Sequence, residues 1–245
     1  MSESAFLAFA RRAERVVFVV LVIAFLMAPL AVGQQYYVGR YDAFGGYTFI
    51  NAPYINLNEN GFHTQVGLRL TNWLSGGFDY SVAKGSNVLL PNMLVSSVQQ
   101  QLGGQLAQLA AAGLLPSGYR MELPVDTKTQ SFTMGPQLAY RHFSAVTFFV
   151  RPNLGALQVT STPRPADAIQ TAVVKQLAPT GKKTDWTYYW GFGGGIEYNV
   201  TQHVALRFQA DLVHNYMFND LLPGTNVVRF SVGPGFQWGR NVVKR

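Results

Sequence analysis

The chain has 245 residues, enough for one or two domains, and it contains no cysteine. The lack of cysteine excludes a disulfide framework and a thiolate metal site. Charged residues make up only 13% of the chain and hydrophobic residues 48%, and the formal net charge is +7. Beyond residue 33, basic residues cluster only at Lys182-Lys183 and Lys244-Arg245, and neither pair resembles a nucleic-acid-binding stripe, so we expect no nucleic acid partner.

Residues 1–33 have the three parts of a secretory signal peptide. Basic residues come first, an apolar segment spans 16–27, and small residues directly before Gln34 favour cleavage there. We therefore predict a signal peptide over 1–33 and a mature domain over 34–245, whose net charge is +6 because three Arg and two Glu are removed (7 − 3 + 2). The alternative is an uncleaved inner-membrane anchor, because residues 16–32 are just long enough to span a bilayer.

Three strands are predicted first, at 41–50, 62–70 and 74–80. In the second of them, Phe62, Thr64, Val66, Leu68 and Leu70 share one side, and His63, Gln65, Gly67 and Arg69 share the other. This period of two is that of a strand. A loop with Pro, Asn and Gly at 51–61 and a tight turn at 71–73 separate the strands.

A long insertion follows, over about residues 81–125. Apolar residues recur there at steps of three and four, which predicts a helix between about 92 and 114: Leu94, Val98, Leu102, Leu106 and Leu109. The adjacent Gly103 and Gly104 weaken its middle by roughly 1 kcal/mol each. Two interpretations stay open: the helix packs on the domain that carries it, or it is a docking surface for lipid or a partner.

The fourth and fifth strands are predicted at 129–140 and 146–156, on either side of a short turn at 141–145. Pro136 and Pro152 interrupt them, and because proline lacks an N–H donor we expect locally broken pairing there. A second insertion, at about 158–184, carries Ile169, Val173 and Leu177 at four-residue steps, which predicts another short helix.

The clearest pattern lies between residues 185 and 211. One side carries Trp186, Tyr188, Trp190, Phe192, Ile196 and Tyr198, and the other carries small, polar or charged residues. A later stretch alternates Leu206, Phe208, Ala210 and Leu212 with Arg207, Gln209 and Asp211. A large aromatic side opposite a polar one is expected where lipid wets the outside of a sheet that encloses a polar lumen. These residues predict strands six and seven.

A loop at 214–226 and an eighth strand at 227–238 complete the chain. Long connections alternate with short turns, at 71–73, 141–145 and 199–203, as in outer-membrane barrels with short periplasmic turns. We therefore predict an all-β fold: an eight-stranded antiparallel up-and-down transmembrane β-barrel with short helices in two extracellular loops. Both ends of the mature chain then face the periplasm, where an aromatic girdle is expected from Trp73, Tyr140, Phe143, Tyr198 and Trp238.

The inward side of these strands carries five acids and five arginines: Asp42, Asp79, Asp185, Glu197 and Asp211, and Arg69, Arg141, Arg151, Arg207 and Arg229. The interior of an eight-stranded barrel is only wide enough for its side chains to fill. An unpaired charge there is costly, whereas a paired one is tolerated. We therefore predict a salt-bridge network that plugs the lumen. A narrow ion path gated by the same pairs is the alternative, and acid–base catalysis by the carboxylates is a third, weaker one.

Other chemistry has little support. The histidines at 63, 142, 203 and 214 are dispersed, so we expect no metal site. His214 with Asp220 is the single candidate for a catalytic pair, and no serine lies close to it in sequence. Gly191, Gly193 and Gly195 make room for the arginines and do not complete a dinucleotide fingerprint. We therefore predict no enzymatic activity and no cofactor.

Several segments carry a family resemblance: GGYTF at 45–49, TNWL at 71–74, FGGGIEYNVTQHVALR at 192–207, and a last strand ending in aromatic residues. With them the mature chain resembles small OmpA-like outer-membrane β-barrels, and most of all a porin-like "outer membrane protein beta-barrel domain" group of acidobacterial type. Such barrels usually end on an aromatic residue. Here GRNVVKR follows Trp238, so Phe236 or Trp238 must be the aromatic residue that the assembly machinery reads.

The resemblance implies a location in the cell outer membrane, with outer-membrane lipids and the outer-membrane assembly machinery as partners. It implies a structural or surface-interaction role, or alternatively a small porin-like channel for ions or polar solutes. Such a fold hosts many activities, so the partner of the extracellular loops stays unidentified. No peptidoglycan-binding domain follows the barrel in this sequence, so the resemblance does not imply a tethering role.

Overall fold

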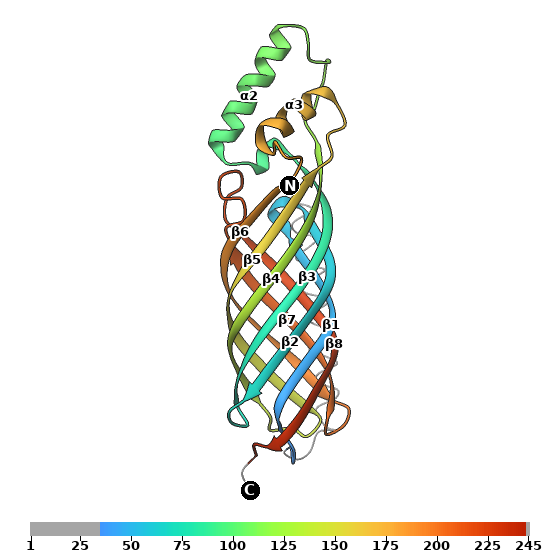
Figure 1. Ribbon diagram of the computed structural model, residues 1–245, viewed down its shortest axis with the longest axis vertical. Coiled ribbons are helices and arrows are strands. Elements are labelled where there is room, and N and C mark those ends of the chain that lie inside the picture. Colours follow the sequence, from blue (N-terminus) through green and yellow to red (C-terminus); the bar gives the residue numbers. More distant parts are fainter. Residues whose placement is uncertain (1–34, 244–245) are drawn as a thin grey trace.

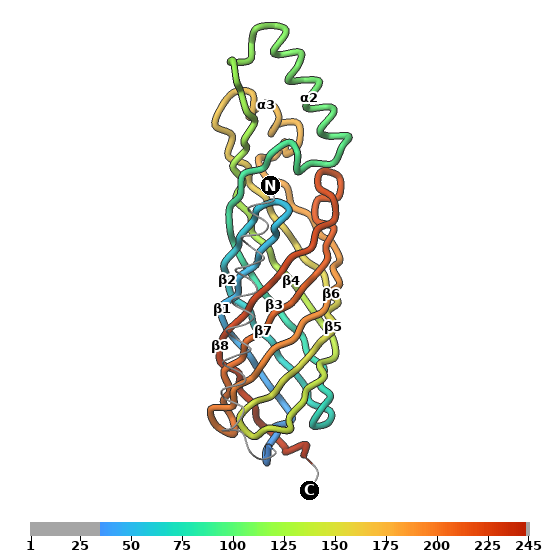
Figure 2. The backbone as a smooth tube through the Cα atoms, turned by 180° about the vertical axis from the view of Figure 1, so that it is seen from behind, coloured from blue at the N-terminus to red at the C-terminus, as the bar shows by residue number. Residues whose placement is uncertain are grey.

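Eight antiparallel strands close into a barrel in which each strand pairs with its neighbours in sequence and β1 pairs with β8 (Figures 1 and 2). The computed structural model describes residues 35–243, so the predicted signal peptide at 1–33 lies outside the described residues. The strands are β1 Gly39–Ala52, β2 Leu57–Arg69, β3 Leu74–Leu89, β4 Leu123–Tyr140, β5 Val146–Pro163, β6 Lys183–Asn199, β7 Val204–Asn215 and β8 Thr225–Asn241. The predicted eight-stranded up-and-down barrel is confirmed.

The two ends of the barrel differ in their connections. At the end that we call the turn end, short turns at 70–73, 141–145 and 200–203 join the strands. At the opposite end, the helical end, lie the α-helices α2 Ser96–Ala111 and α3 Ala168–Leu177 (Figure 1). Two 3-10 turns, η2 Pro53–Ile55 and η3 Pro91–Met93, also lie in connections at the helical end.

The strands extend further toward the helical end than the sequence pattern predicts. The insertion predicted at about 81–125 is confined to 90–122, because β3 continues to Leu89 and β4 begins at Leu123. The insertion predicted at 158–184 is confined to 164–182. The loops predicted at 51–61 and 214–226 shrink in the same way. In these extensions outward positions such as Lys84 and Ser86 are polar, so the outward hydrophobic signal ends before the strand does.

Pairing is interrupted where the two strand prolines face each other. Along β4 and β5 the register runs to Met134 opposite Leu154 and resumes only at Leu138 opposite Val150. Pro136 and Pro152 lie in this gap, and neither can donate an N–H to the ladder. On their other sides both strands remain paired, to β3 and β6. The predicted local break is confirmed, and it is limited to the β4–β5 seam.

The two helices depend on different local features. α3 begins at an Asp167 cap whose side chain accepts the backbone N–H of Gln170 at 2.7 Å. The Tyr119 hydroxyl donates to the same carboxylate at 3.0 Å, and partial burial together with this carboxylate raises the pKa of Tyr119. α2 has no side-chain cap, and Leu102 is its one buried residue. No helix within residues 35–243 is both long and apolar enough to cross a membrane.

The barrel wall has two sections with opposite hydrophobic patterns. From the turn end upward, outward residues are large and exposed, as in the register row Val66, Phe78, Met134, Leu154 and Trp190. Toward the helical end the inward residues become the apolar ones, including Ile50, Leu57, Val159, Val213 and Val227. The pattern changes at the outward row that contains Lys84 and Lys128. We call the part on the turn side of this row the lower section and the rest the upper section.

Candidate functional site

The lumen of the lower section holds most of the predicted charge network. Four acids and four arginines lie buried in two ion-paired clusters. The turn-side cluster contains Asp42, Arg69, Glu197 and Arg207. The middle cluster contains Asp79, Arg151, Asp211 and Arg229. Each cluster pairs two carboxylates with two guanidinium groups, so each is formally neutral.

Arg207 is the centre of the turn-side cluster. It lies directly opposite Glu197 in the β6–β7 register and donates its Nε to the Glu197 carboxylate at 2.8 Å. Its Nη2 donates to Asp42 at 3.0 Å and its Nη1 to the Gln65 side-chain oxygen at 2.7 Å. Arg69 completes the cluster, with its Nε 3.8 Å from an oxygen of Asp42. With 1% of its surface exposed, Arg207 crosses the lumen rather than lining it.

Two aromatic rings hold the Arg207 guanidinium group as well. Its central carbon lies 5.3 Å from the ring centre of Phe44 and 5.5 Å from that of Phe149. Cation–π contacts of this kind strengthen when water is excluded. The guanidinium group therefore has partners both in its plane and on its faces, and little space remains around it.

The middle cluster closes the lumen a second time. Asp211 lies directly opposite Arg229 in the β7–β8 register and accepts from its Nη2 at 2.7 Å. Arg151 donates its Nη1 to Asp79 at 3.1 Å, and its Nε lies 3.4 Å from Asp211. His63 adds an imidazole nitrogen 3.4 Å from Asp79, while its other nitrogen lies 3.0 Å from the Ser231 hydroxyl. The carboxylates are thus shared between cations from several strands.

Two predicted network residues lie elsewhere. Asp185 is half-buried at the helical end, where its carboxylate accepts the backbone N–H of Phe218 at 2.6 Å. Arg141 lies in the turn at 141–145 and donates to the backbone carbonyl of Asn72. Neither side chain has an ion pair within the described residues. The two-residue alternation puts both residues in the inward phase, but they lie beyond the two ends of the ion-paired part of the lumen.

Several residues that bond inside the lumen were not predicted as members of the charge network. Gln65 and His63 were assigned to the inward side without a partner, and both prove to bond to members of the clusters. Glu59 is 1% exposed and accepts from the Thr127 hydroxyl, yet it lies in a segment that was predicted to be a loop. Tyr189 is 4% exposed and bonds to Thr133, also inside the lumen. Continuing the inward phase of β2 to its true start at Leu57 finds Glu59, and the other three residues already lie in the inward phase of predicted strands.

The glycines of β6 serve the lumen differently from the sequence expectation. A Cβ on Gly193 would lie 1.8 Å from an Asp211 oxygen, and one on Gly195 would lie 2.1 Å from the Phe208 carbonyl oxygen. A Cβ on Gly191 would meet the backbone of β7 at Leu212. These glycines therefore make room for an acid and for the neighbouring strand. They do not directly make room for the arginines.

The five predicted girdle residues lie near the turn end. Trp73, Tyr140, Tyr198 and Trp238 are all exposed, and Phe143 is half-buried. Tyr140 contacts Phe143 edge to face at 6.1 Å, and Trp238 stacks on Tyr41 at 6.1 Å. Outward-facing aromatic residues also occur toward the top of the lower section. There Tyr80 donates its hydroxyl to Gln130 at 3.0 Å, and Trp186 stacks on Phe132 at 6.0 Å.

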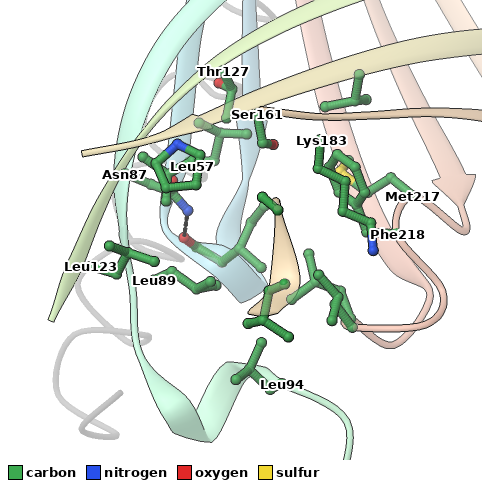
Figure 3. A pocket seen from close by; sticks show the side chains of 18 of the residues that line it. Leu57, Asn87, Leu89, Leu94, Leu123, Thr127, Ser161, Lys183, Met217 and Phe218 are labelled. Carbon is green, nitrogen blue, oxygen red and sulfur yellow. Dashed lines mark hydrogen bonds between the residues drawn. The ribbon is translucent and has the colours of Figure 1, made fainter. Parts of the chain in front are cut away.

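An apolar cavity of about 80 Å³ lies at the helical end. Side chains from β2, β4 and the connections point toward one another around it, including Leu57, Leu94, Leu123 and Met217 (Figure 3). Leu102 of α2 and Val173 of α3 belong to the same apolar cluster as Leu57 and Leu94. The helical end is closed by a small hydrophobic core of its own.

The polar groups around this cavity are mostly satisfied. Asn87 donates its amide to the carbonyl of Ile55 at 3.0 Å, the bond drawn dashed in Figure 3. Lys183 also lines the cavity, and its ammonium group pairs with Asp220. Because Asp220 pairs with Lys183 while His214 bonds to Asn226 at 2.8 Å, His214 and Asp220 do not form a catalytic pair. Among residues 35–243 no three His, Asp or Glu side chains converge to hold a metal ion.

No protein-family model and no curated protein matches the chain. Among solved structures it is similar to Neisserial surface protein A, with 13% identity over 81% of this chain and 96% of that one and a TM-score of 0.49. It is also similar to outer membrane protein OprG of Pseudomonas aeruginosa, with 10% identity over 85% of this chain and 100% of that one and a TM-score of 0.47. A third similar structure is Ail, the attachment invasion locus protein of Yersinia pestis, with 13% identity over 81% of this chain and 97% of that one and a TM-score of 0.42. The resemblance to an acidobacterial-type group stays a prediction.

Proposed function

We propose that this chain is a non-enzymatic outer-membrane β-barrel with a plugged lumen, which has a structural role or presents its helical end to a partner. The observation that carries the proposal is the pattern of the lower section. There large apolar and aromatic side chains cover the outside, while ion pairs fill the inside. This arrangement suits a barrel whose outer surface lies in hydrocarbon.

The height of the lower section supports this location. Lys84 lies ten residues along β3 from Leu74 (84 − 74), and Lys128 lies twelve residues along β4 from Tyr140 (140 − 128). At about 3.4 Å per residue and a strand tilt of about 40°, these distances rise about 26 Å and about 31 Å. An outward apolar band about 25 Å tall is what outer-membrane barrels carry.

Two consequences follow for partners. Outer-membrane lipids contact the lower section, and the assembly machinery reads the aromatic residues of β8, Phe236 or Trp238, since both are exposed. Export depends on the predicted signal peptide at 1–33. The helical end faces outward from the cell, because long connections of such barrels are extracellular.

The filled lumen favours one of the two sequence-based alternatives. Charges are expensive to bury, so breaking a neutral cluster to open a path costs several kcal/mol. Arg207 and Arg229 are each 4% exposed or less, and each bonds to a carboxylate of the facing strand. We therefore favour a closed barrel over a small ion channel.

Conductance across a planar bilayer tests the proposal. The mature chain, residues 34–245, should insert from detergent and give no steady openings. The double variant Arg207→Ala, Arg229→Ala removes one guanidinium group from each cluster and should introduce leak events, whereas Arg240→Ala, which removes an exposed arginine near the end of β8, should stay silent. Steady openings by the unaltered protein would favour a channel. A mature chain that dissolves without detergent as a compact monomer would overturn the membrane location.

A further inference from the structure

Two lysines face each other on the outer surface at the boundary between the two sections. Lys84 of β3 and Lys128 of β4 are directly opposite in the β3–β4 register, and both are exposed. Directly opposite residues of an antiparallel pair have Cβ atoms only about 5 Å apart, and like charges at this position destabilise the pairing. The pair therefore costs stability unless an anion compensates it.

The protein supplies no such anion within residues 35–243. No carboxylate lies within 4.0 Å of either ammonium group. The nearest acid along the outward face of β4 is Asp126, two residues from Lys128, and it is paired with Arg164. The outward neighbours in the same row are neutral: Asn60 on β2 and Thr160 on β5. The two positive charges are left for an external group.

The surface directly on the turn side of the pair resembles a lipid interface. The Tyr80 hydroxyl donates to Gln130, and Gln130 donates to Gln158 at 2.8 Å, which forms an outward polar chain across three strands. Aromatic residues with one polar end are enriched at the boundary between hydrocarbon and headgroups. Trp186, 57% exposed, lies beside Gln158 in the register. Lys128 lies one outward position beyond Gln130, and Lys84 lies two outward positions beyond Tyr80, at the level of the headgroups.

We infer that Lys84 and Lys128 form a binding site for the phosphate of a lipid headgroup in the outer leaflet. Two ammonium groups on adjacent strands approach one phosphate from two sides, and the phosphate removes their mutual repulsion. The lipid tail then runs down the apolar outward row of β3 and β4, past Phe132 and Phe78. This inference rests on the proposed membrane location of the barrel and adds a lipid class to it.

Lipid binding to the folded barrel in detergent micelles tests the site by native mass spectrometry. The probes are phosphatidic acid, which carries a phosphate monoester, and phosphatidylcholine, which carries no net charge. Two basic residues beside an anionic headgroup favour the anionic lipid by on the order of tenfold. We expect this preference in the unaltered protein and its loss in the double variant Lys84→Gln, Lys128→Gln.

A matched control removes the same charge elsewhere. Lys175 at the end of α3 and Lys182 before β6 are both exposed, and the double variant Lys175→Gln, Lys182→Gln should keep the preference. Equal preference in the two double variants would overturn the inference. Displacement of phosphatidic acid by inorganic phosphate alone would also overturn it, because the site would then bind free phosphate. If no variant enters micelles or vesicles as a folded barrel, the membrane location fails instead.

A single charge reversal provides an independent readout. Lys84→Glu converts the repulsive pair into an opposite-charge pair, which stabilises facing strands. In phosphatidylcholine vesicles this variant should unfold at a higher temperature than the unaltered protein, and in vesicles that also contain phosphatidic acid the gain should disappear. A change in unfolding temperature that is the same in both lipid mixtures would contradict the inference.

Discussion

In the lower section charged side chains lie inside and aromatic ones outside, whereas in the upper section apolar residues lie inside and polar ones outside. The same strands run through both sections, so Lys84 faces outward on β3 only a few residues from the outward Phe78. The difference shows that strand geometry alone does not decide which side is apolar. Under the proposed membrane location, the surrounding solvent decides it, with hydrocarbon around the lower section and water around the upper one.

The interiors of the two sections are therefore stabilised by different forces. The lower interior depends on neutralised, hydrogen-bonded ion pairs, which contribute little net stability but are very costly to break. The upper interior depends on burial of apolar area, at about 25 cal/mol per Å². Three experiments test this contrast.

The largest effect is expected where an ion cluster is broken. Arg207→Ala leaves Glu197 and Asp42 buried without their shared cation, and we expect a loss of about 3–5 kcal/mol in the free energy of unfolding. Urea unfolding in lipid vesicles measures it. The exposed Arg240→Ala should change the same quantity by less than about 0.5 kcal/mol. A loss below about 1 kcal/mol for Arg207→Ala would contradict the high cost expected for breaking a buried ion cluster.

A matched valine pair locates the hydrocarbon boundary. Val150 in the lower section is 42% exposed and Val88 in the upper section is 41% exposed, and both face outward. Val150 lies four residues from the start of β5, about 10 Å from the turn end. We expect Val150→Arg to destabilise the barrel by about 2–4 kcal/mol and Val88→Arg by less than about 0.5 kcal/mol. Vesicle unfolding measures both, and equal losses would contradict the two-section description.

The smallest global effect is expected in the helical connection. Leu102→Ala removes the one buried side chain of α2, and we expect about 2 kcal/mol less protection against local opening of that helix. The free energy of global unfolding of the barrel should change little, because the eight strands pair without α2. Limited proteolysis of residues 90–122 measures the local effect. The exposed Leu114→Ala is the control, and equal cleavage of the two variants would show that Leu102 does not anchor α2.

The strands in the lower section were predictable because their outward residues are apolar and their inward residues polar, which gives a period of two. The run from Trp186 to Tyr198 shows this most clearly. The sequence predicted that inward acids pair with inward arginines, but it did not predict individual pairs such as Glu197 with Arg207. Strand phase says which residues face inward and not which ones meet. Asp185 and Arg141 show the limit of prediction from strand phase, because both share the inward phase and yet lie beyond the two ion-paired clusters.

By itself the sequence determined the number of strands, their direction and the side that each residue faces, because a period of two is a local property. It also determined the two helical connections. Only the tertiary structure decided which charges meet, where the strands end, and that Lys84 and Lys128 are opposite each other. These features depend on the register between strands, and register is set by closure of the whole barrel rather than by any one segment.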